Sequence, residues 1–352
     1  MTMKKLVIGL IILLSLSILV PPIAAHVPIS AQDGETLETA YFIEDPTKSW
    51  VVYSNLHEGA EPQYFAFEIE AGARIRMMLA IPVNADPYVF QPSIALMGPG
   101  LTNSSSIPSY LEIPESAGVI IFESESATLA YEGFTPTSFY ELIQFEILAP
   151  FTGEYYFAVY EPNEGGSFSV ALGYVESFTL EEWLLVPFNV MVIHQWNGQS
   201  LLMILAPMIF TIILGMAYYL NRRHEFQALE NPISWIGVVG ALLFIGSGVT
   251  IFYQMIIAAL ASVSLQLIIT FIFGLLPILL GYYTIRIVTA ETWHNQKDRR
   301  IRLLVLGLIA PFLWAGLLIG PALVILSSLL SSGIVFRKTS AIRNETQLHA
   351  PQ

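Results

Sequence analysis

The chain has 352 residues, of which 54% are hydrophobic and only 12% are charged, and its mean hydropathy is +0.62. Soluble globular domains carry about 25% charged residues, so this composition excludes an ordinary cytosolic protein. The chain has no cysteine, which excludes disulfides, thiolate metal sites and a cysteine nucleophile. The net charge of −13 argues against nucleic acid as a partner, because phosphate neutralisation needs a basic surface.

The N-terminal 25 residues have the pattern of a secretory signal. Lys4 and Lys5 form a charged start, residues 6–20 are apolar, and two prolines precede a small-residue cleavage site at Ala25. We therefore predict that residues 1–25 are a signal peptide. The alternative is an uncleaved anchor, which would leave the same residues exported.

The charges of the remaining chain are unevenly distributed. Residues 27–190 contain 23 acidic and three basic side chains, whereas the rest of the chain contains five acidic and twelve basic side chains. Lys and Arg in short loops are biased to the cytoplasmic side of a membrane. These patterns predict a multi-pass protein of the cell membrane with residues 27–199 on the extracytoplasmic side.

The exported block, residues 27–176, reads as an all-β sandwich. Short alternating runs rich in aromatic and β-branched residues are separated by Gly and Pro turns, and the clearest runs are residues 64–70, 74–81, 154–160 and 167–175. Strands at this spacing are typical of antiparallel sandwiches. About 145 residues are sufficient for one hydrophobic core without disulfides.

Several of these strands carry motifs of a known family. A Tyr/Phe strand ends in Ala71-Gly72, a later strand leads into residues 96–100 (Leu-Met-Gly-Pro-Gly), and residues 153–159 read Gly-Glu-Tyr-Tyr-Phe-Ala-Val. This block resembles the bacterial and archaeal pre-peptidase C-terminal domain. The resemblance implies a jelly-roll-like sandwich that acts as a non-catalytic accessory. Some members bind calcium, but residues 92–95 lack the acidic side chains often found before the Gly-Pro turn.

Residues 177–199 form the predicted juxtamembrane segment. Thr179 and Glu182 have the spacing of a capping box, which opens a short helix. Trp183 and Trp196 lie at positions expected for the belt of aromatic residues at the membrane–water interface. We interpret the segment as an interfacial helix, and an ordinary connector is the alternative.

Residues 200–336 are predicted to form an all-α transmembrane bundle of about four helices. Three apolar runs, residues 201–220, 233–260 and 265–288, are each long enough to cross about 30 Å of hydrocarbon. The fourth, residues 303–336, would measure about 51 Å as a single helix and is interrupted by proline and glycine. We favour one long kinked span, and a broken hairpin is the alternative.

The choice between these two topologies sets the side of the polar tail, residues 337–352. One span places the tail outside, where Asn344 lies in a glycosylation sequon, and a hairpin places it inside.

The spans contain few polar residues away from their ends. Tyr253, Gln254, Gln266 and Thr270 are the main ones, and no Asp, Glu, Lys or Arg lies mid-span, which weakens a transporter interpretation. Small-residue faces, including Gly316-x-x-x-Gly320, allow close helix packing either within the bundle or with a second membrane protein.

The candidate metal ligands are His26 and His57. Cleavage after Ala25 would expose His26 as a terminal amine with its own imidazole, and this pair binds copper when a further histidine completes the site. Acidic pairs such as Glu44-Asp45 are candidate calcium ligands, although 23 acids in one domain form near pairs by chance. A solvated, repulsive surface is the simpler interpretation of these acids.

The remaining site candidate is Asn103, which begins an Asn-Ser-Ser glycosylation sequon. No catalytic motif is found, so the sequence predicts a non-enzymatic membrane protein that binds a ligand, or a membrane-protein or cell-surface partner, through its sandwich. The alternatives are an accessory subunit of a membrane enzyme complex, linked to copper through His26, and a transporter with an outer regulatory domain.

Overall fold

The computed structural model describes residues 26–30, 34–57, 59, 61–124 and 126–330. The predicted signal peptide and polar tail lie outside these residues. The chain divides into two compact units. The sandwich unit contains the chain up to residue 183 together with residues 189–200 and 255–269, and the helical unit contains residues 184–188, 201–254 and the chain from residue 270.

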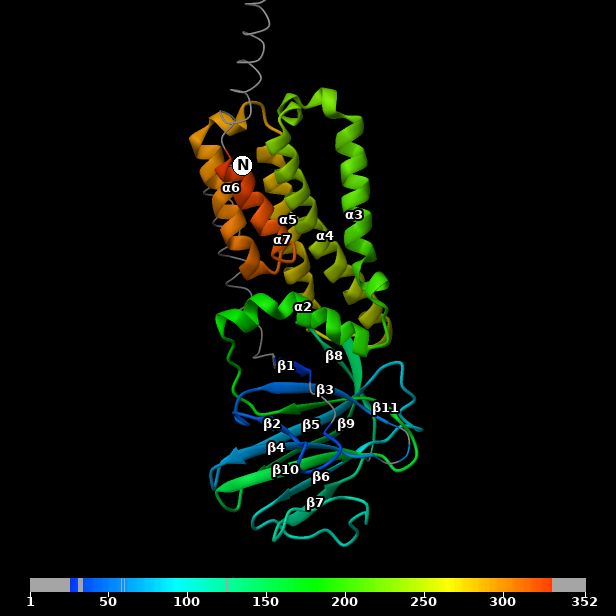
Figure 1. Cartoon of the computed structure of the whole chain (residues 1–352). Coiled ribbons are helices and arrows are strands. Elements are labelled where there is room, and N and C mark those ends of the chain that lie inside the picture. Colours follow the sequence, from blue (N-terminus) through cyan, green and yellow to red (C-terminus); the bar gives the residue numbers. More distant parts are fainter. Residues whose placement is uncertain (1–25, 31–33, 58, 60, 125, 331–352) are drawn as a thin grey trace, which may run out of the picture. The chain divides into compact units, whose positions relative to one another are not determined.

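The sandwich unit is built on two β-sheets (Figure 1). The six-stranded sheet has the order β1-β3-β11-β5-β9-β8 and the five-stranded sheet the order β2-β4-β10-β6-β7. The strands are β1 (Val27–Ser30), β2 (Tyr41–Ile43), β3 (Trp50–Leu56), β4 (Gln63–Ile69), β5 (Arg74–Pro82), β6 (Ser93–Gly98), β7 (Gly118–Phe122), β8 (Thr128–Glu132), β9 (Thr137–Leu148), β10 (Gly153–Tyr160) and β11 (Gly166–Leu172).

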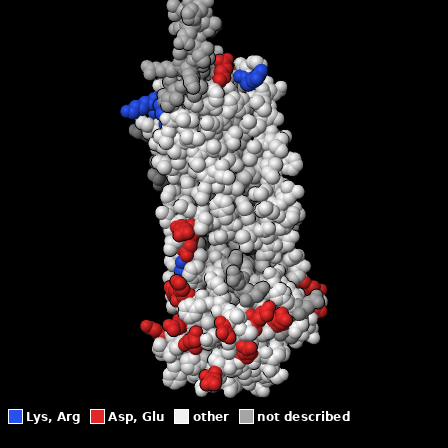
Figure 2. All heavy atoms as spheres, in the orientation of Figure 1, with Lys and Arg blue, Asp and Glu red and all other residues white. Residues whose placement is uncertain are grey.

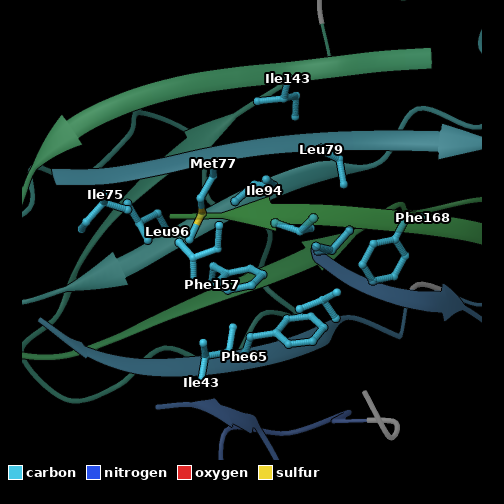
Figure 3. Packing of buried hydrophobic residues seen from close by; sticks show 14 of the residues in the cluster. Ile43, Phe65, Ile75, Met77, Leu79, Ile94, Leu96, Ile143, Phe157 and Phe168 are labelled. Carbon is cyan, nitrogen blue, oxygen red and sulfur yellow. The ribbon is translucent and has the colours of Figure 1, made fainter. Parts of the chain in front are cut away.

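The alternation of side chains along these strands produces the core. Phe65 and Phe157 from the five-stranded sheet stack with ring centroids 4.7 Å apart, and they face Met77 and Phe168 from the six-stranded sheet (Figure 3). The four strands predicted most clearly correspond to β4, β5, β10 and β11. The β-sandwich prediction is therefore confirmed.

One further helix belongs mostly to the sandwich unit. Helix α2 (Leu180–Trp196) occupies the predicted juxtamembrane segment. Its N-cap is Thr179, whose side chain accepts a hydrogen bond from the Glu182 amide while the Glu182 carboxylate accepts one from the Thr179 amide. This reciprocal pair satisfies two of the free amides at the start of the helix and confirms the predicted capping box.

Three helices of the described chain are long and apolar enough to cross a membrane. They are α3 (Leu201–Asn221), α4 (Pro232–Ala261) and α5 (Leu267–Val288), and they match the three predicted runs. Short 3-10 turns η1 (Arg223–Glu225) and η2 (Gln227–Glu230) join α3 to α4, and η3 (Trp293–Asn295) follows α5. The prediction of a membrane protein is supported by these helices.

The favoured single span over residues 303–336 is wrong for the part of it that the structure describes. The chain forms α6 (Lys297–Ile309), the turn η4 (Ala310–Leu313) and α7 (Ile319–Leu329), and α7 packs back against α6. The Arg300 guanidinium donates to the carbonyl oxygens of Ser328 (2.7 Å) and Leu329 (3.0 Å), so the start of α6 meets the end of α7. The broken hairpin is the observed arrangement.

The described part of this hairpin is too short to cross a bilayer. Helix α7 has 11 residues and is about 16 Å long, roughly half of the 30 Å hydrocarbon core. Its turn is compact because Trp314, Leu317 and Leu318 adopt left-handed conformations, and the Gly316 amide donates to the Ser247 hydroxyl of α4 (2.8 Å). Non-helical backbone is tolerated at membrane depth only where it is buried and hydrogen-bonded in this way.

The predicted small-residue faces are used inside the bundle. A Cβ atom added to Gly316 or Gly320 would lie within 3 Å of the Phe244 ring of α4, and one added to Gly248 would meet the Gly274 carbonyl of α5. Glycine therefore allows these helices to approach each other closely. Of the two interpretations of these small-residue faces, packing within the bundle and packing with a second membrane protein, the structure shows the first.

The hairpin makes a prediction about sidedness. Cysteines introduced at Gln296 and Leu329 should both react with a membrane-impermeant maleimide from the same side of sealed vesicles, because Arg300 ties these two ends together. The native chain has no cysteine, so labelling reports only the introduced thiols. A cysteine at Ser200, which precedes α3, should react from the other side. Labelling of positions 296 and 329 from opposite sides would restore the single-span topology.

Candidate functional site

Both ends of α2 are fixed to the sandwich by specific contacts. At its start, the Lys48 ammonium lies 2.6 Å from the Glu182 carboxylate, and these side chains are only 12% and 22% exposed. Burial alone would raise the pKa of Glu182, but the hydrogen bonds from Lys48 and the Thr179 amide outweigh it and lower that pKa. The capping carboxylate therefore also anchors the helix to the strand region.

The end of α2 is held by Trp196. Its indole Nε1–H donates to the Phe168 carbonyl of β11 at 3.0 Å, and its ring meets Tyr53 of β3 edge-on with centroids 5.1 Å apart. The Asn197 side-chain amide donates to the Thr137 hydroxyl at the start of β9. Trp196, expected from the sequence in an aromatic belt, thus binds the outer face of the six-stranded sheet.

The sandwich also binds the connection between α4 and α5, residues 255–269. The Gly133 amide donates to the Gln266 side-chain carbonyl at 2.9 Å, and the Ser138 hydroxyl donates to the Ala258 carbonyl at 2.9 Å. We call these contacts, together with those of Trp196 and Asn197, the junction. The interpretation of Gln266 as a polar residue inside a span is corrected, since it precedes α5 and accepts from the β8–β9 hairpin.

The junction contains ionisable groups in unusual environments. Burial and, to a smaller extent, the nearby Glu176 charge raise the pKa of the Glu132 carboxyl to about 7, against the opposing hydrogen bond from the Phe134 amide. Burial and the Glu132 charge raise the pKa of Tyr53. Burial lowers the pKa of His194 on α2 to about 4, so its ring is neutral at neutral pH.

The opposite end of β9 carries a second feature, an exposed apolar pair. Leu148 ends β9 and is 61% exposed, and Phe151 in the β9–β10 turn is 60% exposed. We call this pair the distal tip. Because β9 runs for 12 residues between Thr137 and Leu148, the distal tip lies about 35 Å along the strand from the junction.

The distal tip is held in place by the buried side chain of Tyr155. Its hydroxyl lies 2.9 Å from the Phe151 carbonyl oxygen and 3.0 Å from that of Pro99, so it bridges two loops. The Thr152 hydroxyl accepts from the Ala71 amide at 2.9 Å. Gly100 has φ +77°, and any Cβ there would collide with the Phe151 ring. These contacts fix the turn that presents the apolar pair.

The structure does not bring the two candidate metal ligands together. His26 precedes β1, and its Nδ1 lies 2.6 Å from the Ser49 hydroxyl. His57 follows the end of β3, eight residues beyond Ser49 and therefore about 26 Å along the strand. Burial and the Arg76 charge lower the pKa of His26 to about 4. Within the described ranges, no group of three or more His, Asp or Glu side chains is arranged to hold a metal. Copper binding stays a prediction.

The third candidate, Asn103, lies exposed in the β6–β7 loop, and its side-chain oxygen accepts from the Val119 amide at 2.9 Å. Its glycosylation stays a prediction. Acidic side chains are scattered over the face of the sandwich seen in Figure 2 rather than gathered in one place. This distribution fits a solvated surface better than a calcium site, which needs several converging oxygens.

Comparisons with known proteins add one likeness. No family model matches the chain, and no curated protein matches it. Among solved structures, it is similar to the pre-peptidase C-terminal domain of a collagenase from Bacillus anthracis, with 13% identity and a TM-score of 0.22, over 40% of this chain and 97% of that domain. The likeness is consistent with the resemblance stated from the strand motifs. At this identity and TM-score it carries no information about function.

Sequence reasoning missed both the junction and the distal tip. The residues Gly133, Ser138 and Gln266 are ordinary turn or polar residues whose pairing joins segments more than 100 positions apart. Leu148 and Phe151 lie on either side of Ala149-Pro150, shortly before Gly153. This pattern predicts a turn, but it does not predict that the apolar side chains of the turn are exposed to solvent. The one signal in the sequence for an exposed apolar tip is an alternating strand that ends in an apolar turn.

Removal of one hydroxyl tests how the distal tip is held. We expect Tyr155→Phe to lower the free energy of unfolding by about 1–2 kcal/mol, because it leaves the carbonyl groups of Pro99 and Phe151 without their bridging donor. Thermal unfolding of the detergent-solubilised full chain measures the change. The control is Tyr156→Phe on the opposite face of β10, which should cost less. Equal stability of Tyr155→Phe and the wild type contradicts the bridging role.

Proposed function

We propose that the protein displays its β-sandwich on the extracytoplasmic side of the cell membrane and binds a ligand or protein partner there without catalysing a reaction. In this proposal the helical unit is the membrane anchor, and the sandwich is the recognition element. The distal tip is the contact surface. Its preorganised exposed apolar pair is the observation that carries the proposal.

The distribution of charge at one end of the helical unit supports the proposed sidedness. The Trp293 indole donates to the Ser234 hydroxyl at 2.9 Å, which brings the α5–α6 connection beside the start of α4. The basic residues at this end are Arg222, Arg223, Lys297, Arg299, Arg300 and Arg302. Positive residues favour the cytoplasmic side, so α3 then runs inward from an extracytoplasmic start.

The junction supports a display role. Hydrogen bonds from Gly133 and Ser138 join the sandwich to residues 255–269, and Trp196 joins it to α2. These contacts occupy the end of the sandwich where β9 begins. The distal tip, where β9 ends, is free of them. A rigidly held domain loses less entropy when its far end binds a partner.

The chemistry of the distal tip indicates the kind of partner. Leu148 and Phe151 offer an apolar contact on a domain whose surface is strongly acidic. Binding residues lie disproportionately on loops that a rigid scaffold holds in place, and the β9–β10 turn is such a loop. The net negative charge of the domain repels anionic headgroups, which favours a protein surface over a lipid surface as the partner.

Site-specific photo-crosslinking in native membranes tests this proposal. A photoreactive amino acid at Phe151 should give a discrete protein adduct, and Leu148→Ser in the same chain should reduce its yield at least fivefold. The same probe at Phe42, an exposed aromatic residue on β2, is the matched control and should give no such adduct. Absence of an adduct at Phe151, or an adduct unaffected by Leu148→Ser, contradicts the distal tip as the binding surface.

A further inference from the structure

The β5–β6 loop, residues 83–92, presents two apolar side chains to its surroundings. Tyr88 is 87% exposed and Val89 is 55% exposed. Local hydrogen bonds hold them there: the Tyr88 amide donates to the Asp86 carboxylate at 2.9 Å, and the Phe90 amide donates to the Asp86 backbone carbonyl at 3.0 Å. Phe90 itself is buried in the sandwich core. The exposed pair is therefore fixed between a hydrogen-bonded turn and a core residue.

The start of this loop lies close to the end of α4. Pro82, the last residue of β5, pairs with Phe139 of β9. The neighbouring Ser138 hydroxyl donates to the Ala258 carbonyl at 2.9 Å. Ala258 lies three residues before α4 ends at Ala261, which is a rise of about 5 Å along the helix. The loop therefore begins at the level where this apolar helix ends.

A second contact links the loop to the residues that precede α3. A Cβ atom added to Gly198 would collide with the Asn84 side chain, so these two residues touch. Helix α3 begins at Leu201, three residues further on, and three residues span at most about 11 Å. The loop is thus close both to the first residue of one apolar helix and to the last residue of another.

We propose that Tyr88 and Val89 insert into the lipid–water interface of the leaflet next to the sandwich. The proposal rests on the proposed function, because it takes α3 and α4 as helices that cross the membrane. It adds a lipid contact that these helices do not make, on a loop that precedes α3 by more than 100 residues in the sequence.

The chemistry of the loop suits a lipid interface. A tyrosine side chain has an apolar ring and a polar hydroxyl, and tyrosine is enriched at membrane–water interfaces, where both parts are accommodated. In residues 83–92 the one charged side chain is Asp86, and its carboxylate already accepts from the Tyr88 amide. Insertion of Tyr88 and Val89 removes apolar surface from water, and this is the favourable contribution to the contact.

The accessibility of a spin label measures the depth of the loop in the full chain reconstituted in phosphatidylcholine nanodiscs. The label is attached through Val89→Cys, and the chain has no native cysteine. Its accessibility to oxygen, which concentrates in the bilayer, is compared with its accessibility to a water-soluble nickel complex. We expect the oxygen-to-nickel ratio to be several-fold higher than in the matched control Leu148→Cys, an exposed apolar position at the opposite end of β9. Tyr88→Ser in the Val89→Cys chain should lower the ratio, because it removes the larger of the two inserted side chains.

A third label, attached through Leu214→Cys within α3, separates the possible failures. It reports whether α3 lies in lipid, as the proposed function requires, and it should give the highest ratio of the three positions. Equal ratios at Val89 and Leu148, with a lipid-embedded label at Leu214, overturn the loop insertion and leave the proposed display role intact. A high ratio at Val89 that Tyr88→Ser does not change also overturns the insertion of the pair. A water-exposed label at Leu214 contradicts the membrane anchor, and the loop insertion with it.

Discussion

A β-sheet that buries side chains on both of its faces needs a cover on each face, and this requirement organises the sandwich unit. On β11, Val170 points into the core while its neighbour Ala171 is buried on the outer face. Ala80 of β5 is likewise buried. The contacts of α2 and of residues 255–269 supply the outer cover. Polar groups of these two segments also form hydrogen bonds with the sandwich. The segments are therefore held at one position on the sheet, in addition to covering its apolar side chains.

A second constraint acts on the helical unit, where backbone amides and carbonyls must be satisfied without water. The α6–α7 hairpin satisfies this constraint with side-chain hydrogen bonds. The Arg300 guanidinium donates to the last carbonyls of α7, and the Ser247 hydroxyl accepts from the Gly316 amide in the turn. Three non-glycine residues in left-handed conformations are the cost of this tight reversal. The reversal brings Gly316 and Gly320 against the Phe244 ring of α4.

The local patterns of the sequence predicted the strands, the three spans and the capping box, because each depends on periodicity or on spacing over a few residues. The α6–α7 reversal was predicted only as an alternative, since Pro311 and Gly320-Pro321 are compatible with either a kink or a turn. The pairings Gly133–Gln266 and Ser138–Ala258 were not predictable. They depend on tertiary placement of segments separated by more than 100 residues, and a turn glycine or a serine gives no signal of its partner. The same holds for His26 and His57, because β1 pairs parallel with β3 and places His26 beside Ser49 at the start of β3, whereas His57 follows the end of β3.

Hydrogen–deuterium exchange of the full chain in nanodiscs, at a fixed pH of 6, tests the central claim that the sandwich is fixed to the segments joining the spans. The account predicts slow exchange at the Gly133 amide and a matched loss of that protection in Gln266→Ala, while the core amides of β10 remain protected in both proteins. Rapid exchange of Gly133 in the parent chain, with β10 protected, would contradict the account, because the sandwich would then be folded but not fixed to the connection.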